Sequence, residues 1–309
     1  MDGSDILVSS VLTVITAATP LAFAALGELV VEKSGVLNLG VEGMMIVGAV
    51  VAFATGVTTE SAALAILAGA LAGLVMASLF GFTVLILMSN QVATGLALTI
   101  FGLGFSALVG HGFVGVSYPG LMKLDIPGLS TLPFIGQILF AQDVMVYLSV
   151  AMAAAIAWFL TKSRPGLILR AVGENHDAAH AIGYPVIRIR FFAIMFGGAL
   201  AGLGGAYLSL AYTPLWVENM TAGRGWIALA LVVFAAWRPW RAFFGAYLFG
   251  GITIVQLHIQ GVGVDVPSQL LSMLPYLVTI IVLVFISKGS VRQRLSAPGS
   301  LQKNFYAAS

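Results

Sequence analysis

The sequence predicts an all-α, polytopic membrane protein, and its composition and apolar runs carry that prediction. Of its 309 residues, 60% are hydrophobic and only 8% are charged, whereas soluble domains carry about 25% charged residues. Apolar runs of about 20 residues recur along the chain, and each is long enough to cross a hydrocarbon core of roughly 30 Å as a helix. A water-soluble globule and a disordered chain are both excluded, because each needs more charged surface.

We expect about nine transmembrane helices, within a range of eight to ten, in a single domain that covers residues 1–309. The apolar runs lie at 6–27, 36–57, 61–88, 92–112, 143–161, 191–211, 225–237, 241–259 and 270–287. The first residues carry Asp2 and Asp5 in place of a basic segment, so no cleavable signal peptide is expected.

Two of these spans depart from a plain membrane helix. The run 225–237 has 13 residues and rises only about 20 Å, which suits a half-helix. The run 36–57 opens with Asn38, Gly40 and Glu42, which interrupt its apolar pattern near one end. Short or interrupted segments in opposed halves of a chain are typical of transporters with a path between broken helices.

Basic residues in short loops collect on the cytoplasmic side of a membrane, so they predict the orientation of the chain. The loop 162–190 is the richest and is assigned to the cytoplasm; it holds Lys162, Arg164, Arg170, Arg188 and Arg190. Counting outward places 12 of the 14 basic residues inside. The N-terminus and the loop 113–142 are then outside, and the tail 288–309 is cytoplasmic.

Faces of small residues recur every four positions, a spacing that lets membrane helices approach closely. One such face comprises Gly69, Gly73, Ala77 and Gly81, and another comprises Gly197, Ala201 and Gly205. We expect both faces to lie at helix interfaces.

The sequence contains no pattern of an enzyme. Cysteine is absent, which excludes disulfides and thiolate chemistry. Neither a zinc-protease motif nor a nucleotide-binding P-loop occurs, so this chain cannot hydrolyse ATP by a P-loop. His176 and His180 have the spacing of a metal-binding pair, but two ligands without a third are a weak signal. We therefore expect no metal or cofactor in this chain.

The cytoplasmic loop contains the signals of a short helix. Asn175 suits an N-cap, Asp177 suits the first turn, and Gly183 suits the C-terminal stop. Ala178 and Ala179 give this helix a slim profile that fits a groove on another protein. The alternative is an amphipathic helix that rests on the membrane surface.

Five stretches, in order, carry a resemblance to a known family. They are SGVLNLGVEGM (34–44), NQVATG (90–95), IPGLS (126–130), RPGL (164–167) with RAVGEN (170–175), and GRGWIALA (223–230). The chain resembles permease subunits of bacterial ABC importers in the branched-chain amino acid and simple-sugar permease superfamily, and within it the nucleoside permeases. Two departures are His176, where Pro is frequent, and Trp226, where a smaller aromatic residue is usual.

The resemblance implies a set of partners. These are a second permease chain, as a related heterodimer partner or an identical copy, two ATPase domains that use Mg-ATP, and an extracytoplasmic substrate-binding lipoprotein, all at the bacterial cytoplasmic membrane. It also implies that the helix at 175–182 is the coupling helix that docks on an ATPase. The residues assigned to that coupling are Arg170, Gly173, Glu174, Asn175, Asp177, Ala178, Ala179 and Gly183.

Glu42 is the one ionisable residue that the predicted spans enclose, and a carboxylate within a membrane is costly enough to suggest a function. Asn38 precedes it at i, i+4 and is expected on the same helix face. Two readings stay open: Glu42 lines the solute path, or it hydrogen-bonds backbone at a helix break. The candidate path residues are Asn38, Glu42, Asn90, Gln91, Thr94, Arg224 and Trp226.

Arg224 and Trp226 also have two readings each. Arg224 either anchors the outer membrane interface or contacts the solute. Trp226 either belongs to the interfacial belt of aromatic residues or stacks on a base.

For the whole chain, the leading expectation is an ABC permease for nucleosides or a related sugar-like solute. The rivals are another simple-sugar permease and a self-contained secondary transporter or channel that uses Glu42 as an ion site.

Overall fold

The computed structural model describes residues 3–124, 135–261 and 297–306, with isolated positions between 128 and 284. This part of the chain is helical, and its only β-type pairings are isolated bridges. The helices are α1 (Gly3–Lys33), α2 (Val41–Thr59), α3 (Ala62–Leu85), α4 (Gln91–Gly110), η1 (His111–Phe113), α5 (Ile135–Phe140), α6 (Val144–Lys162), α7 (Arg164–Glu174), α8 (His176–Ala181), α9 (Val186–Tyr207), η2 (Leu208–Tyr212), α10 (Arg224–Phe234) and α11 (Pro239–Gly261).

Six segments of the described part are long and apolar enough to cross a membrane, which confirms the polytopic all-α class. They are Val8–Lys33, Val41–Thr59, Ala62–Leu85, Gln91–Phe113, Val144–Lys162 and Val186–Tyr212. The seventh predicted span is the short apolar helix α10, and the eighth corresponds to α11. The ninth, 270–287, and the stretch 126–130 lie mostly outside the described residues.

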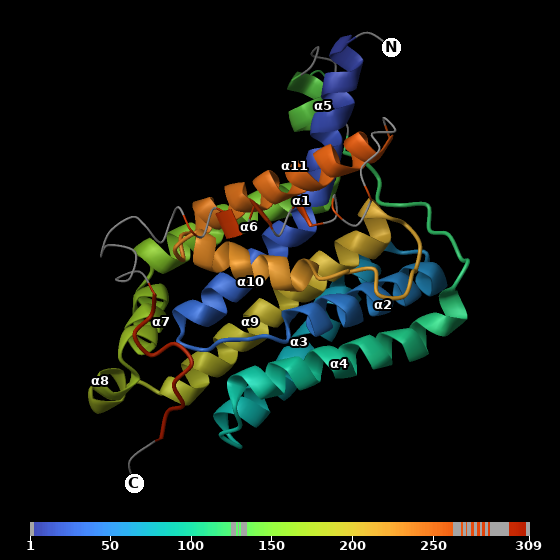
Figure 1. The fold of residues 1–309 in the computed structure, drawn as a ribbon. Helices are drawn as coiled ribbons and strands as arrows, with labels where there is room; N and C mark the ends of the chain where they lie inside the picture. Colours follow the sequence, from blue (N-terminus) through green and yellow to red (C-terminus); the bar gives the residue numbers. More distant parts are fainter. Residues whose placement is uncertain are drawn as a thin grey trace.

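Helices α1, α2, α3 and α9 form the centre of the bundle, with α4 on one side and α6 on the other (Figure 1). Glycines permit this packing: a Cβ on Gly73 would overlap the carbonyl oxygen of Gly198, and one on Gly202 would overlap that of Gly69. Because lipid provides no hydrophobic drive between helices, such close backbone contacts hold the bundle together. The predicted face that includes Gly69 and Gly73 is thereby confirmed as an interface. The second predicted face also lies at interfaces, because a Cβ on Gly197 would overlap Val31 of α1 and one on Gly205 would overlap the carbonyl oxygen of Met45 of α2.

The first span is longer than predicted, and this corrects the placement of charge. Helix α1 continues to Lys33, so Glu28 and Glu32 lie within it, and both are buried. The prediction that Glu42 is the one ionisable residue within a span is therefore wrong. The error arises because the predicted apolar run ends before the first carboxylate, Glu28. The helix continues beyond it through Leu29, Val30 and Val31, which are also buried.

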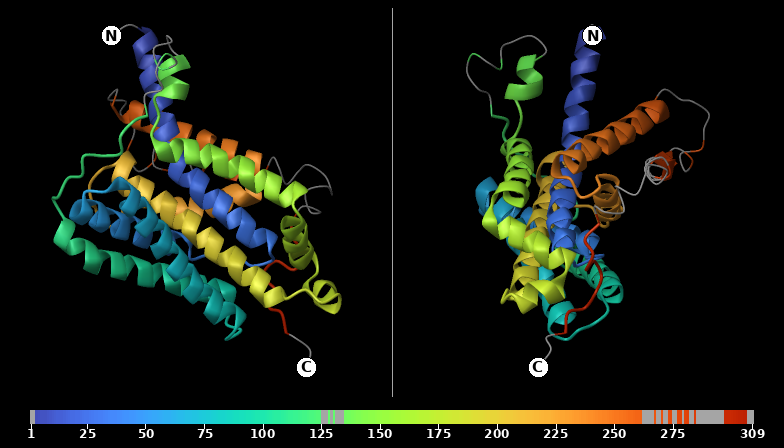
Figure 2. Two further views of the ribbon diagram at one scale, coloured as in Figure 1. Left: turned by 180° about the vertical axis from the view of Figure 1, so that it is seen from behind. Right: turned by 90° about the vertical axis from the view of Figure 1, so that its left-hand side faces the viewer.

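The chain has two distinct ends (Figure 2). Helices α7 and α8 and the C-terminal segment 297–306 lie together at one end, away from the N-terminal end of α1 and from α5. The region that the sequence assigned to the cytoplasm is thus gathered in one place.

Candidate functional site

A buried carboxylate joins the starts of two helices. Glu42 lies in the first turn of α2 and is 3% exposed. Its Oε1 accepts a hydrogen bond of 2.9 Å from the backbone N–H of Gly223, and its Oε2 accepts one of 2.6 Å from that of Gly225. Helix α10 has no side-chain cap at its own N-cap, Gly223. Glu42 therefore supplies the cap, at the end where the helix dipole favours a negative charge.

The backbones of α2 and α10 approach each other closely at this cap. A Cβ on Gly225 would lie 2.5 Å from the Cα of Glu42. Gly223 adopts a φ of +83°, which a residue with a side chain rarely tolerates. Both glycines of the GRG stretch are therefore needed for α10 to begin against α2.

Asn38 does not lie on the helix face of Glu42, so the i, i+4 prediction is wrong. Helix α2 begins at Val41, and Asn38 precedes it in a turn in which its Oδ1 accepts a hydrogen bond of 2.9 Å from Gly40 N–H. The amide side chain competes with helix formation in this way. The backbone N–H of Asn38 donates to Oε1 of Glu28 at 3.0 Å, so α1 supports the turn before α2.

The three candidates near α4 divide between two places. Gln91 accepts a hydrogen bond of 2.9 Å from Leu37 N–H through Oε1, and its Nε2 donates to Oδ1 of Asn304 at 3.4 Å. Asn90 caps α4 through its side chain, and Thr94 hydrogen-bonds the serine before that cap. Only Gln91 is thus brought to the turn before α2.

Arg224 is occupied by backbone and aromatic contacts. Its Nη1 donates to the carbonyl oxygens of Met220 at 3.0 Å and Thr221 at 3.3 Å, and its guanidinium lies 5.2 Å from the ring centroid of Tyr212. These contacts fit an anchor for the loop before α10. Trp226, in the first turn of α10, is half-buried and packs against the core.

The loop that the sequence assigns to the cytoplasm contains two helices. The predicted short helix is α8, whose N-cap Asn175 accepts a hydrogen bond of 3.0 Å from Ala178 N–H, and Gly183 follows it with a φ of +92°. Helix α7 precedes it and was not predicted. Its signals were present: Ser163 caps it by accepting from Gly166 N–H at 3.1 Å, and Pro165 lies in its first turn.

A buried guanidinium ties α8 to two distant segments. The side chain of Arg190 is fully buried. Its Nε donates to the carbonyl oxygen of Ser34 at 3.0 Å, its Nη1 to that of Lys303 at 3.1 Å, and its Nη2 lies 3.0 Å from Nδ1 of His176. The sequence identifies Arg190 only as a topology signal. Ser34 and Lys303 lie far from it along the chain, and the residues next to Arg190 give no sign of these contacts.

The C-terminal segment 297–306 is packed into the same junction. Ser300 N–H donates to the carbonyl oxygen of Gly173 at 2.8 Å, and Oγ of Ser300 accepts from His176 N–H at 3.2 Å. Phe305 is buried, and its ring centroid lies 5.4 Å from that of His176 and 5.1 Å from that of His180. The segment therefore covers the inner face of α7 and α8.

His176 lies in an environment that disfavours its charged form. Burial lowers the pKa of its imidazole from the usual 6.5, and the nearby Arg190 guanidinium lowers it further. As an acceptor for Arg190, Nδ1 must carry no proton. The metal hypothesis for His176 and His180 gains no third ligand among the described residues.

A basic hollow of about 900 Å³ opens beside α7. Its charged lining residues are Lys33, Arg170, Glu174, Arg238 and Arg241. Trp237 also lines it, donates from Nε1 to Oε2 of Glu32 at 2.6 Å, and lies 5.9 Å from the Lys33 ammonium. Positive charge is thus concentrated at the end of the bundle that carries α7 and α8.

Sequence comparison agrees with this architecture. A putative glucose ABC transporter permease protein of Haloferax volcanii is 39% identical and covers 94% of this chain and 95% of its own length. A nucleoside ABC transporter permease protein of Lactococcus lactis is 32% identical, and the match covers 88% of this chain and 90% of the relative. A guanosine ABC transporter permease protein of Bacillus subtilis is 29% identical, and the match covers 96% of this chain and 98% of the relative.

Each of these three organisms also contains a second similar permease for the same named solute. The second glucose permease of Haloferax volcanii is 29% identical to this chain, the second guanosine permease of Bacillus subtilis is 27% identical, and the second nucleoside permease of Lactococcus lactis is 25% identical. The family described as "Branched-chain amino acid transport system / permease component" matches residues 10–283, which begin within α1 and extend past α11. The chain therefore belongs to this family of transport-system permease components.

Proposed function

We propose that this chain is the membrane-spanning subunit of an ABC importer and forms half of the path for a nucleoside or a related sugar. The observation that carries the proposal is the hydrogen-bonded contact from α8 through Arg190 to Ser34, which begins the connection between α1 and α2. This contact connects an exposed cytoplasmic helix with the helix break at Glu42. An importer driven by a separate ATPase needs such a connection between its docking surface and its path.

The outward surface of α7 and α8 supplies the docking residues. Arg170, Glu174, Asn175, Asp177 and Ala178 are exposed there. A partner with a groove for a slim, charged helix end can contact all five without disturbing the bundle.

Gly173 and Ala179 have a different role from the one implied by resemblance. Both are buried, and a Cβ on Gly173 would overlap the carbonyl oxygen of Lys33. We assign them to packing of the coupling helices against α1 and the C-terminal segment. Gly183 serves as the stop of α8 through its positive φ.

We propose that the solute path lies beside the break between α2 and α10. Two buried polar atoms there, Oε2 of Glu28 and Oγ1 of Thr221, have no hydrogen-bond partner within the described part of the chain. Buried polar groups are rarely unpartnered. Hydroxyl groups of a passing ribose or hexose can satisfy them, which supports a sugar-bearing solute. The relatives named for glucose, nucleosides and guanosine all take solutes that contain a sugar ring.

The rival function, a secondary transporter that binds an ion at Glu42, is disfavoured by the same geometry. Each carboxylate oxygen of Glu42 already accepts a backbone N–H bond from the start of α10. An ion would have to displace a helix cap to bind there, and this would cost both bonds.

The partners follow from the proposal. The second permease is a related, non-identical chain, since each of three organisms has two non-identical relatives with the same named solute. Two ATPase domains bind Mg-ATP, and an extracytoplasmic lipoprotein delivers the solute. The N-terminus lies outside, and the C-terminal segment lies in the cytoplasm of a bacterial cell.

Two assays test the proposal. Reversing both charges in Glu174→Lys with Asp177→Lys is expected to abolish co-purification of the ATPase, and an intact complex would refute the docking claim. Binding of nucleosides, pentoses and hexoses to the partner lipoprotein then distinguishes the solutes. Thr221→Val is expected to raise the KM for uptake several-fold, because one hydroxyl partner is lost.

A further inference from the structure

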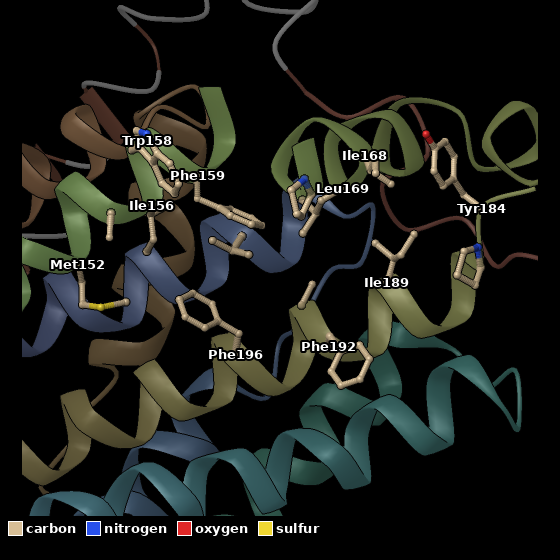
Figure 3. A pocket seen from close by; sticks show the side chains of 15 residues that line it. Met152, Ile156, Trp158, Phe159, Ile168, Leu169, Tyr184, Ile189, Phe192 and Phe196 are labelled. Carbon is tan, nitrogen blue, oxygen red and sulfur yellow. The ribbon is translucent and has the colours of Figure 1, made fainter. Parts of the chain in front are cut away.

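An apolar groove of about 670 Å³ runs along α9 between α6 and α7 (Figure 3). Phe196, Phe192 and Ile189 line it from α9, and Ile156 and Phe159 face them from α6. Its lining is almost wholly apolar, and Tyr184 lies at one end, at the link between α8 and α9. A groove of this kind on a membrane helix bundle must be filled, because an empty one forfeits dispersion contacts.

The length of the groove matches one leaflet of a bilayer. Its α9 wall extends from Pro185 to Phe196, or about 16 Å at 1.5 Å per residue. This equals about half of the roughly 30 Å hydrocarbon core, which is the depth of one leaflet. An acyl chain of one leaflet matches that length.

Two exposed basic residues lie one helical turn from residues that line the groove. Lys162 follows the lining residue Trp158 by one helical turn on α6, and Arg188 precedes the lining residue Phe192 by one turn on α9. Residues one turn apart share a helix face. Both basic side chains are exposed, and long basic side chains extend toward headgroups from such positions.

We propose that this groove binds one acyl chain of an anionic phospholipid of the cytoplasmic leaflet, with Lys162 and Arg188 at its headgroup. Basic pockets between membrane helices on the cytoplasmic side suit such headgroups. The bound lipid packs against Pro165 and Ile168 of α7, so it supports the coupling helices from the membrane side. The inference depends on the proposed orientation, but it needs neither the ATPase nor the identity of the solute.

The test uses Trp158, which lines the groove and is 63% exposed. The full chain is placed in nanodiscs that contain phosphatidylglycerol or phosphatidylcholine with brominated acyl chains, which quench indole fluorescence on contact. The Trp158 signal is the difference between the native chain and Trp158→Phe. We expect several-fold stronger quenching by brominated phosphatidylglycerol at equal mole fraction, and loss of this preference in Lys162→Gln with Arg188→Gln.

A matched pair of variants examines the groove itself. Ala154 and Ala155 are both exposed on α6, but only Ala155 lines the groove. Ala155→Phe should fill it and remove the preference for phosphatidylglycerol, whereas Ala154→Phe should retain it. Equal quenching by both lipids in the native chain would overturn the proposal. Absence of quenching by either lipid would also overturn it, since protein would then cover the groove.

Discussion

Oε2 of Glu42 accepts a hydrogen bond of 2.6 Å from the backbone N–H of Gly225, and this contact makes the start of one broken helix depend on another. Glu42 and Gly225 are 183 residues apart along the chain, yet the carboxylate in α2 completes the N-terminus of α10. A movement of α2 must therefore displace α10. This dependence leads to the first prediction.

Glu42→Gln should reduce uptake at least several-fold without changing solute preference. The amide offers one acceptor oxygen where the carboxylate offers two, and hydrogen bonds to a charged group contribute about 1.5–3 kcal/mol each. Uptake of competing sugars and nucleosides by assembled complexes measures both quantities.

Glu60→Gln is the matched control, because Glu60 is exposed at the opposite end of α2. It should leave uptake unchanged. An altered order of preferred solutes in Glu42→Gln would instead place the carboxylate in the path and contradict the capping role.

Phe305→Ala should loosen the C-terminal segment and lower the amount of solute imported per ATP hydrolysed. Truncating a buried phenylalanine costs about 3–5 kcal/mol in a well-packed site, and this ring packs on both histidines of α8. Transport and hydrolysis are measured together in vesicles. Tyr306→Ala is the control, since Tyr306 is 69% exposed; an equal loss in both variants would refute a specific role for Phe305.

Acidification should release the same segment. The pKa of His176 is lowered in the folded chain, so the unfolded junction takes up a proton first as the pH falls. Neutral His176 contributes its full stabilisation of the folded junction above a pH of about 6.5, the usual pKa of histidine. This contribution is lost as the pH falls from there toward the pKa of His176 in the folded chain. Protease cleavage of the C-terminal segment, measured from pH 8 to pH 5, should accelerate below about 6.5.

His176→Gln keeps an acceptor for Arg190 but cannot titrate. Cleavage of this variant should be nearly independent of pH over the same range. A native chain whose cleavage rate stays constant down to pH 5 would contradict the claim that protonation of the His176 imidazole releases the segment.

Gly202→Ala should unfold or strongly destabilise the bundle. Its Cβ would overlap the backbone of Gly69 on α3, and backbone cannot move aside as a side-chain end can. Gly104→Ala is the matched control on α4, because nothing lies within 4 Å of the added atom. Thermal unfolding in detergent should show a much lower unfolding temperature for Gly202→Ala and an unchanged one for Gly104→Ala.

Local features of this chain could be predicted from its sequence, and long-range ones could not. The half-helix α10 and the cap at Asn175 follow from run length and from residue chemistry at a helix start. The buried contacts of Arg190 join residues more than 100 positions apart. No local pattern encodes such a pairing. The burial of Glu28 within a span was not predicted, because a carboxylate in a sequence indicates the end of an apolar run. In the structure Glu28 lies inside the bundle, where its Oε1 accepts a hydrogen bond from Asn38 N–H.

The central claim is that this chain moves solute only when a separate ATPase acts through α7 and α8. The most direct measurement is solute uptake into vesicles that contain the chain with its permease partner, with or without the ATPase, under ATP or under an ion gradient. The account predicts uptake only with ATPase, ATP and binding protein present. Uptake driven by an ion gradient without the ATPase would contradict it.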